Sequence, residues 1–140
     1  MTQEDKHLLL VDLCGRLPYG VKVESVFINP DTKEHKSCGI EVFDATNLLM
    51  IRDGLGEFKP YLFPLSSMTE EQEKEFKDLY YRFHESAFIF NERFAYDRYS
   101  IKDIGFYPCY LQDWLNKNHF DYRGLIGKGL AIDATNKNIY

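Results

Sequence analysis

The sequence of 140 residues lacks a long hydrophobic run. Its first residues contain no basic cluster, and the apolar run from Leu8 to Val11 is only four residues long. A bilayer-spanning helix needs about 20 predominantly apolar residues, and a secretory signal needs a basic start followed by an apolar segment. We therefore expect no transmembrane helix, no membrane partner and a cytoplasmic location.

Cysteine is scarce, and basic residues are not in excess. The three cysteines, Cys14, Cys38 and Cys109, form no C-x-x-C pair, so reduced and mostly buried thiols are expected. The 17 Lys and Arg residues stand against 22 Asp and Glu, which gives a formal net charge of −5. Nucleic-acid binding relies on clustered basic residues, so this balance argues against a nucleic-acid partner.

The composition is that of a folded domain. Apolar residues make up 44% of the chain and aromatic residues 16%, so a chain of this length can bury a core without disulfides or metals. We predict a single α+β domain over residues 1–140. A helix and a β-meander are expected in residues 1–67, and a helical layer with a C-terminal strand in residues 68–140.

An N-terminal helix is expected over residues 4–17. Thr2 and Asp5 have cap-like spacing, and Pro18 and Gly20 are suited to ending the helix. The apolar residues at helical spacing form a face that is expected to contact the core, namely Leu10, Leu13, Cys14 and Leu17.

Alternating apolar and polar residues predict four strands between residues 21 and 65. We expect them in a small antiparallel meander, strongly curved or closed into a partial barrel. In the second strand Cys38, Ile40 and Val42 are expected to point inward, while Pro60 and Pro64 favour an edge position for the fourth. The expected strands cover residues 21–24, 38–42, 48–52 and 57–62, with turns at 29–32, 44–47 and 53–54.

The second half predicts mainly helix. Thr69 and Gln72 form a capping box, followed by a helix of five turns or more. A shorter helix is expected over about residues 108–118, and a strand near residues 130–132. The long helix has an aromatic face made of Phe76, Leu79, Tyr80, Phe83, Ala87, Phe90 and Phe94.

No local motif commits the chain to a reaction. The glycine-rich segment 124–129 fails the phosphate-loop pattern, because the required positions hold Tyr122 and Gly129. No two histidines share a helix at metal-ligand spacing, and Cys14 is expected to be buried and inert. We therefore expect no catalytic residue, no metal site and no cofactor, and predict that the protein is not an enzyme.

Aromatic residues are the feature that stands above background. Twelve Phe or Tyr residues occupy the 35 positions from Phe76 to Tyr110, and most of them fit an aromatic core. Four exceed what a one-sided helix needs, and rigid aromatic side chains are preferred anchors of protein interfaces. These candidate partner-binding residues are Tyr81, Phe88, Tyr96 and Tyr99.

Four stretches have a distinctive sequence, at residues 17–21 (LPYGV), 59–72 (KPYLFPLSSMTEEQ), 114–126 (WLNKNHFDYRGLI) and 129–135 (GLAIDAT). In these stretches, and in the first helix, the chain resembles a family of short uncharacterised proteins encoded by gut bacteria and their prophages. The resemblance implies an association with a phage or mobile element. It brings no activity, cofactor or catalytic residue with it.

The functional hypothesis from the sequence is a non-catalytic cytosolic protein that binds another protein, or a second copy of itself, through exposed aromatic residues. Two alternatives stay open. One is a nucleic-acid-associated accessory protein, for which Arg93, Arg98 and Lys102 are the available basic residues. The other is a small enzyme with a site that is assembled only in three dimensions.

Overall fold

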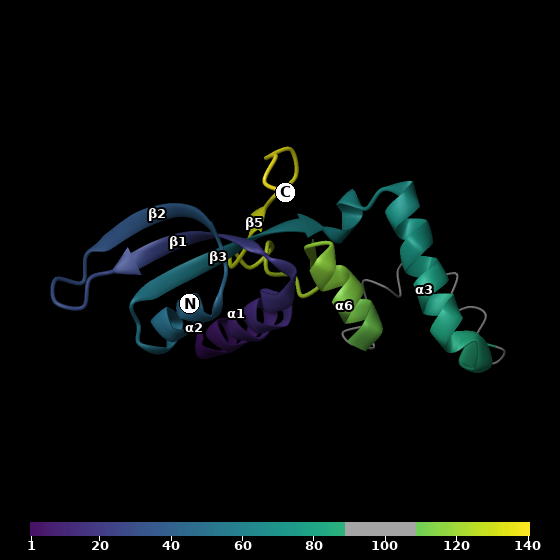
Figure 1. Cartoon of the computed structure of the whole chain (residues 1–140), viewed down its shortest axis with the longest axis horizontal. Coiled ribbons are helices and arrows are strands. Elements are labelled where there is room, and N and C mark those ends of the chain that lie inside the picture. The colour runs from purple at the N-terminus through teal and green to yellow at the C-terminus, as the bar shows by residue number, and fades with distance from the viewer. Residues whose placement is uncertain (89–108) are drawn as a thin grey trace.

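The computed structural model describes residues 1–88 and 109–140, with the side chains of residues 81–88 excepted. Within these residues the chain is an α+β fold of four helices and a five-stranded sheet, which confirms the predicted fold class. Figure 1 shows the three long strands over α1 and α2, with α6 and α3 toward the other end of the molecule. The strand order is β2-β1-β3-β4, with β5 also paired to β3, and the sheet is open.

Helix α1 (Gln3–Arg16) begins at the predicted capping box. The Thr2 hydroxyl accepts a hydrogen bond from the Asp5 N–H at 3.0 Å, and the Asp5 carboxylate accepts one from the Thr2 N–H at 3.4 Å. The predicted core face is partly wrong, since Leu10 and Cys14 are exposed. The residues of α1 that are buried are Leu9, Asp12, Leu13 and Arg16.

This shift of the buried face has a polar cause. Asp12 and Arg16 lie one turn apart and are both fully buried as an ion pair. Their burial rotates the core-facing side of α1, so that Leu9 replaces Leu10 in the core. Hydrophobic spacing alone cannot reveal this, because it assigns charged residues to the solvent side of a helix.

Strands β1 (Lys22–Ile28) and β2 (His35–Val42) form an antiparallel hairpin. The expectation that Cys38, Ile40 and Val42 point into the core is wrong, because all three are exposed. Among the described strands β2 has a neighbour on one side only, and no part of the described chain covers these side chains.

The expected third strand is a helix, α2 (Ala45–Arg52). The segment 44–47, expected as a turn, is the capping box of this helix. The Asp44 carboxylate accepts hydrogen bonds from the N–H groups of Thr46 and Asn47, and the Asn47 side chain accepts one from the Asp44 N–H at 2.7 Å. A four-residue apolar run such as 48–51 fits a strand and a helix equally well, so the cap decides the structure.

Strand β3 (Gly56–Pro64) is central rather than at an edge. It pairs antiparallel with β1 and parallel with the short strands β4 (Phe120–Asp121) and β5 (Ile132–Asp133), so the sheet is mixed rather than a simple meander. The second side of β3 is paired only from Tyr61 onward. Pro60 therefore precedes that pairing and Pro64 ends the strand, which is how a central strand accommodates residues without an N–H.

The second half contains the predicted helices α3 (Glu70–Phe88) and α6 (Cys109–Lys117). The capping box before α3 is confirmed, since Thr69 and Gln72 exchange hydrogen bonds of 2.9 and 3.2 Å. The expected C-terminal strand is β5. In the part of the chain that the structure describes, no helix has the length and apolar character to cross a bilayer.

Two apolar clusters stabilise the fold. The first, called the sheet core, joins α1, the strands and the 125–131 segment. The second, called the aromatic core, joins α3 and α6 to β4. The sheet core contains Leu9, Leu13, Val21, Val23, Phe43, Phe58, Leu62, Leu125, Leu130 and Ala131, and the aromatic core contains Phe76, Leu111, Trp114, Leu115 and Phe120.

Candidate functional site

The aromatic residues predicted to bind a partner lie at or beyond the limit of the described structure. Tyr81 and Phe88 belong to α3, but their side chains are outside the described part. Tyr96 and Tyr99 lie outside the described residues altogether. Their role in binding a partner stays a prediction.

A buried ion pair connects α1 to the C-terminal quarter. The Arg16 guanidinium donates to both carboxylate oxygens of Asp12, at 2.7 and 3.0 Å, and both side chains are fully buried. The same guanidinium donates to the carbonyl of Phe120 at 2.7 Å, and the Nε of Arg123 lies 3.4 Å from Asp12. One carboxylate thus positions two arginines from segments more than 100 residues apart in the sequence.

This cluster carries more positive than negative charge. The Tyr122 ring partly offsets the excess positive charge through cation–π contacts. The guanidinium carbons of Arg16 and Arg123 lie 5.5 and 4.8 Å from the ring centroid. Within the described residues, Nη1 of Arg16 is buried without a hydrogen-bond partner. Both members of the Asp12–Arg16 pair are sealed from solvent, so the arrangement holds segments together and offers no surface to a substrate.

The glycine-rich loop after β4 is organised by a carboxylate. Asp121 accepts hydrogen bonds of 2.9 Å from the N–H groups of both Leu125 and Ile126. Backbone N–H groups of this kind could otherwise bind an anion. Because Asp121 already accepts from these two N–H groups, they are not available to bind an external anion.

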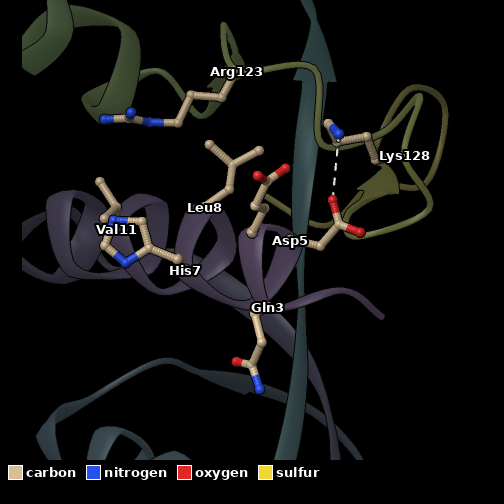
Figure 2. Close-up of a pocket in the computed structure, with 8 residues that line it drawn as sticks. Gln3, Asp5, His7, Leu8, Val11, Arg123 and Lys128 are labelled. Carbon is tan, nitrogen blue, oxygen red and sulfur yellow. Dashed lines mark hydrogen bonds and ion pairs between the residues drawn. The ribbon is translucent and has the colours of Figure 1, made fainter.

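A hollow of about 600 Å³ lies between the first turns of α1 and the 123–128 loop. Figure 2 shows Arg123 extending above Leu8 and Val11, while Lys128 forms an ion pair of 3.3 Å with Asp5. Small-molecule sites are usually enclosed, with a few polar groups converging on the ligand. This hollow is wide open and its cations face acidic neighbours, so it lacks those features. It is lined by Gln3, Glu4, Asp5, His7, Leu8, Val11, Arg123 and Lys128.

His119 and Tyr140 fix the C-terminal segment against the sheet. Their rings stack at 3.9 Å between centroids and 9° between planes. The Tyr140 hydroxyl accepts a hydrogen bond from the Lys22 N–H at 3.0 Å and donates one to the Tyr61 carbonyl at 2.8 Å. Burial, with help from the charges of Arg16 and Lys22, lowers the pKa of His119 to about 4. Burial raises the pKa of Tyr140 to about 12.

The shifted pKa of His119 predicts a loss of stability in mild acid. The imidazole takes up a proton near pH 6.5 in the unfolded chain but only near pH 4 in the folded chain. Protonation of the unfolded state therefore reduces the free energy of unfolding as the pH falls from about 6.5 to about 4.

Urea denaturation across this pH range tests the expectation. A His119→Asn variant is the control, since asparagine tolerates the φ of +59° at this position and does not titrate. The variant is expected to have a shallower pH dependence than the parent chain between pH 6.5 and 4. Equal slopes for both proteins would contradict a role for His119.

The edge of the sheet formed by β2 is the most accessible candidate site. The side chains of Ile40 and Val42 are 53% and 52% exposed. The backbone of β2 pairs with β1 on one side, and among the described strands none pairs with the other side. The strand also contains a β-bulge at Cys38, next to Gly39 with a φ of +86°. We call His35–Val42 the β2 edge.

The sequence did not reveal the β2 edge. The alternation of apolar and polar residues predicted the strand correctly, but the apolar face was expected to contact the core. Alternation shows that two faces differ, and it does not show which face another element covers. The cysteines were misplaced for the same reason, since Cys14, Cys38 and Cys109 are all exposed and form no disulfide.

Within the described residues, no three His, Cys, Asp or Glu side chains are grouped so that they could hold a metal ion. Comparison of the chain with protein-family models, with curated proteins and with solved structures finds no match.

Proposed function

We propose that the chain is a non-catalytic cytosolic protein that binds another polypeptide by adding a strand to the β2 edge. The observation that carries this proposal is an eight-residue strand with an unpaired side and two half-exposed β-branched residues, Ile40 and Val42. Such an edge offers a row of backbone donors and acceptors that an extended peptide can pair with.

The two faces of the β2 edge define the chemistry of the partner. Residues directly opposite each other in a sheet share a face, so Ile40 and Val42 lie with Glu24 and Lys22 of β1 on one face. Lys36 and Glu41 lie on the other face, opposite Phe27 and Val23. A fitting partner segment is extended, with small or β-branched residues on the first face and charges complementary to Lys36 and Glu41 on the second.

The other parts of the structure support binding rather than catalysis. The charged group around Asp12 and Arg16 is buried and internally paired. Three accessible free cysteines fit a reducing compartment such as the cytosol. Tyr81, Phe88, Tyr96 and Tyr99 remain proposed as further contacts, and the association with a phage or mobile element rests on the resemblance in residues 59–72 and 114–126.

Selection of peptides tests the proposed function. The full chain, immobilised, is used to select from a phage-displayed library of random peptides, and the enriched peptides are then measured on the parent chain and on an Ile40→Lys variant. We expect enriched peptides with alternating apolar residues that bind the parent chain at least about tenfold more tightly than the variant, because a buried lysine replaces an apolar contact. Bound peptides are also expected to slow hydrogen exchange at residues 35–42.

A Leu49→Lys variant is the matched control, since Leu49 is 51% exposed but lies on α2. It should bind the selected peptides as the parent chain does. Peptides that ignore Ile40→Lys, or that protect amides outside residues 35–42, would overturn the proposal.

A further inference from the structure

We infer that the strand added to the β2 edge is β2 of a second copy of this chain, so that two sheets join antiparallel across a two-fold axis. This inference rests on the proposed function and names its partner. It is carried by the bulge in β2 and by the positions of Lys36 and Glu41 on either side of it.

The bulge makes the strand self-complementary. Side chains alternate between faces along a regular strand, so two residues five positions apart lie on opposite faces. Here Lys36 is paired with Phe27 and Glu41 with Val23, and these two β1 residues are four apart and share a face. Lys36 and Glu41 therefore share a face as well, because the extra residue, Cys38, shifts the alternation between them.

One two-fold register uses the whole strand. Antiparallel pairing of the eight residues with themselves places His35 opposite Val42, Lys36 opposite Glu41, and Ser37 opposite Ile40. Each of these pairs falls on one face, since Ser37 and Ile40 are paired with Val26 and Glu24 of β1. The bulges of the two copies meet at the two-fold axis. Each strand therefore contributes the same extra residue, and the pairing stays in register on both sides of the axis.

Charge favours this register. Two symmetric Lys36–Glu41 pairs form across the interface, and opposite charges facing each other on neighbouring strands are stabilising. Glu41 lines a hollow of about 360 Å³ beside α2, which leaves space for the facing lysine. A register centred on Glu41 would instead place two glutamates opposite each other, and it would leave part of each strand unpaired.

The same features favour a second copy of this chain over other strands. A bulge and a lysine at a sheet edge are devices that prevent random strand addition. A regular foreign strand keeps its side chains on matching faces only on one side of Cys38, so it can pair with part of β2 but not with its whole length. A second β2 carries the same bulge at the same place, so the obstacle to other partners is absent for a copy of this chain.

Sedimentation velocity in the presence of a reductant, over a wide range of concentration, tests the inference. The parent chain is expected to show a concentration-dependent dimer. Lys36→Glu and Glu41→Lys each place like charges opposite each other twice and should weaken dimerisation roughly tenfold. An equimolar mixture of the two variants, and the double variant Lys36→Glu/Glu41→Lys, should both recover dimers because each restores opposite charges. Lys74→Glu makes the same charge change on exposed α3 and should leave the dimer unchanged.

The outcomes separate the two proposals. A chain that stays monomeric at every concentration but binds selected peptides at residues 35–42 overturns the self-pairing and leaves the proposed function standing. A dimer that is unaffected by both single variants, or that is not recovered in the mixture, overturns the Lys36–Glu41 register. Circular dichroism of each variant identifies any loss of folding, which is relevant for Glu41 because it accepts a hydrogen bond from Asn47 at 3.1 Å.

Discussion

Replacing Asp12 by alanine is expected to reduce the free energy of unfolding by about 3–5 kcal/mol, the usual cost of leaving a buried charge without its partner. The Arg16 guanidinium is fully buried and donates two of its three hydrogen bonds to Asp12. Arg123 loses the same carboxylate at 3.4 Å. The variant therefore leaves two cationic groups near each other, and the described residues that still compensate them are the Phe120 carbonyl and the ring and hydroxyl of Tyr122.

Urea denaturation followed by circular dichroism measures this loss. Asp53→Ala is the matched control, since Asp53 and Arg52 form an ion pair of the same 2.7 Å distance at exposed positions, and its loss should change the free energy of unfolding far less because solvent screens an exposed pair. A double variant, Asp12→Leu with Arg16→Met, removes both charges and is expected to recover much of the stability. Equal costs for Asp12→Ala and Asp53→Ala would contradict the structural role assigned to the buried pair.

Replacing Trp114 by alanine is expected to cost about 3–5 kcal/mol, because it empties the centre of the aromatic core. The indole stacks on Phe120 at 5.7 Å between centroids and contacts the edge of Phe76 at 5.3 Å. It is 8% exposed and connects α6 both to α3 and to β4. A loss of this size should lower the melting temperature by about 10 °C in a chain of this length.

Trp114→Phe is the informative comparison. It keeps an aromatic ring between Phe76 and Phe120, and it removes an indole N–H that has no hydrogen-bond partner within the described residues. We expect it to cost less than half as much as Trp114→Ala. Thermal melts followed by circular dichroism are suitable, since this chain has a single tryptophan and the variants lose its fluorescence. A negligible cost for Trp114→Ala would show that the aromatic core does not stabilise the fold.

Local signals in the sequence predicted the starts of α1 and α3 correctly. The boxes at Thr2–Asp5 and Thr69–Gln72 form as expected, because a cap depends on residues only three positions apart. The box at Asp44–Asn47 has the same chemistry, but the sequence pattern predicts a turn there and a strand after it, whereas the structure has helix α2. Asp and Asn are common in both structures, so this segment was decided by the helix that follows it.

Properties that depend on distant segments could not be predicted. The central place of β3 results from its pairing with Phe120 and Ile132, more than 50 residues later. The burial of Arg16 results from the Phe120 carbonyl and the Asp12 carboxylate together. The candidate site could not be predicted for the same reason. The exposure of Ile40 depends on which elements lie beside β2 rather than on the alternation within the strand.

Strand β3 has a consequence for how the molecule unfolds. Its consecutive residues Leu62 and Phe63 pack into different clusters, the first into the sheet core and the second against the aromatic core. Neighbouring side chains of a strand point to opposite faces, so a single backbone segment supports both clusters at once. Fraying of the α3–α6 pair would free Phe63 while Leu62 keeps the strand in place. We therefore expect the α3–α6 half to unfold first and the hairpin half to persist longer.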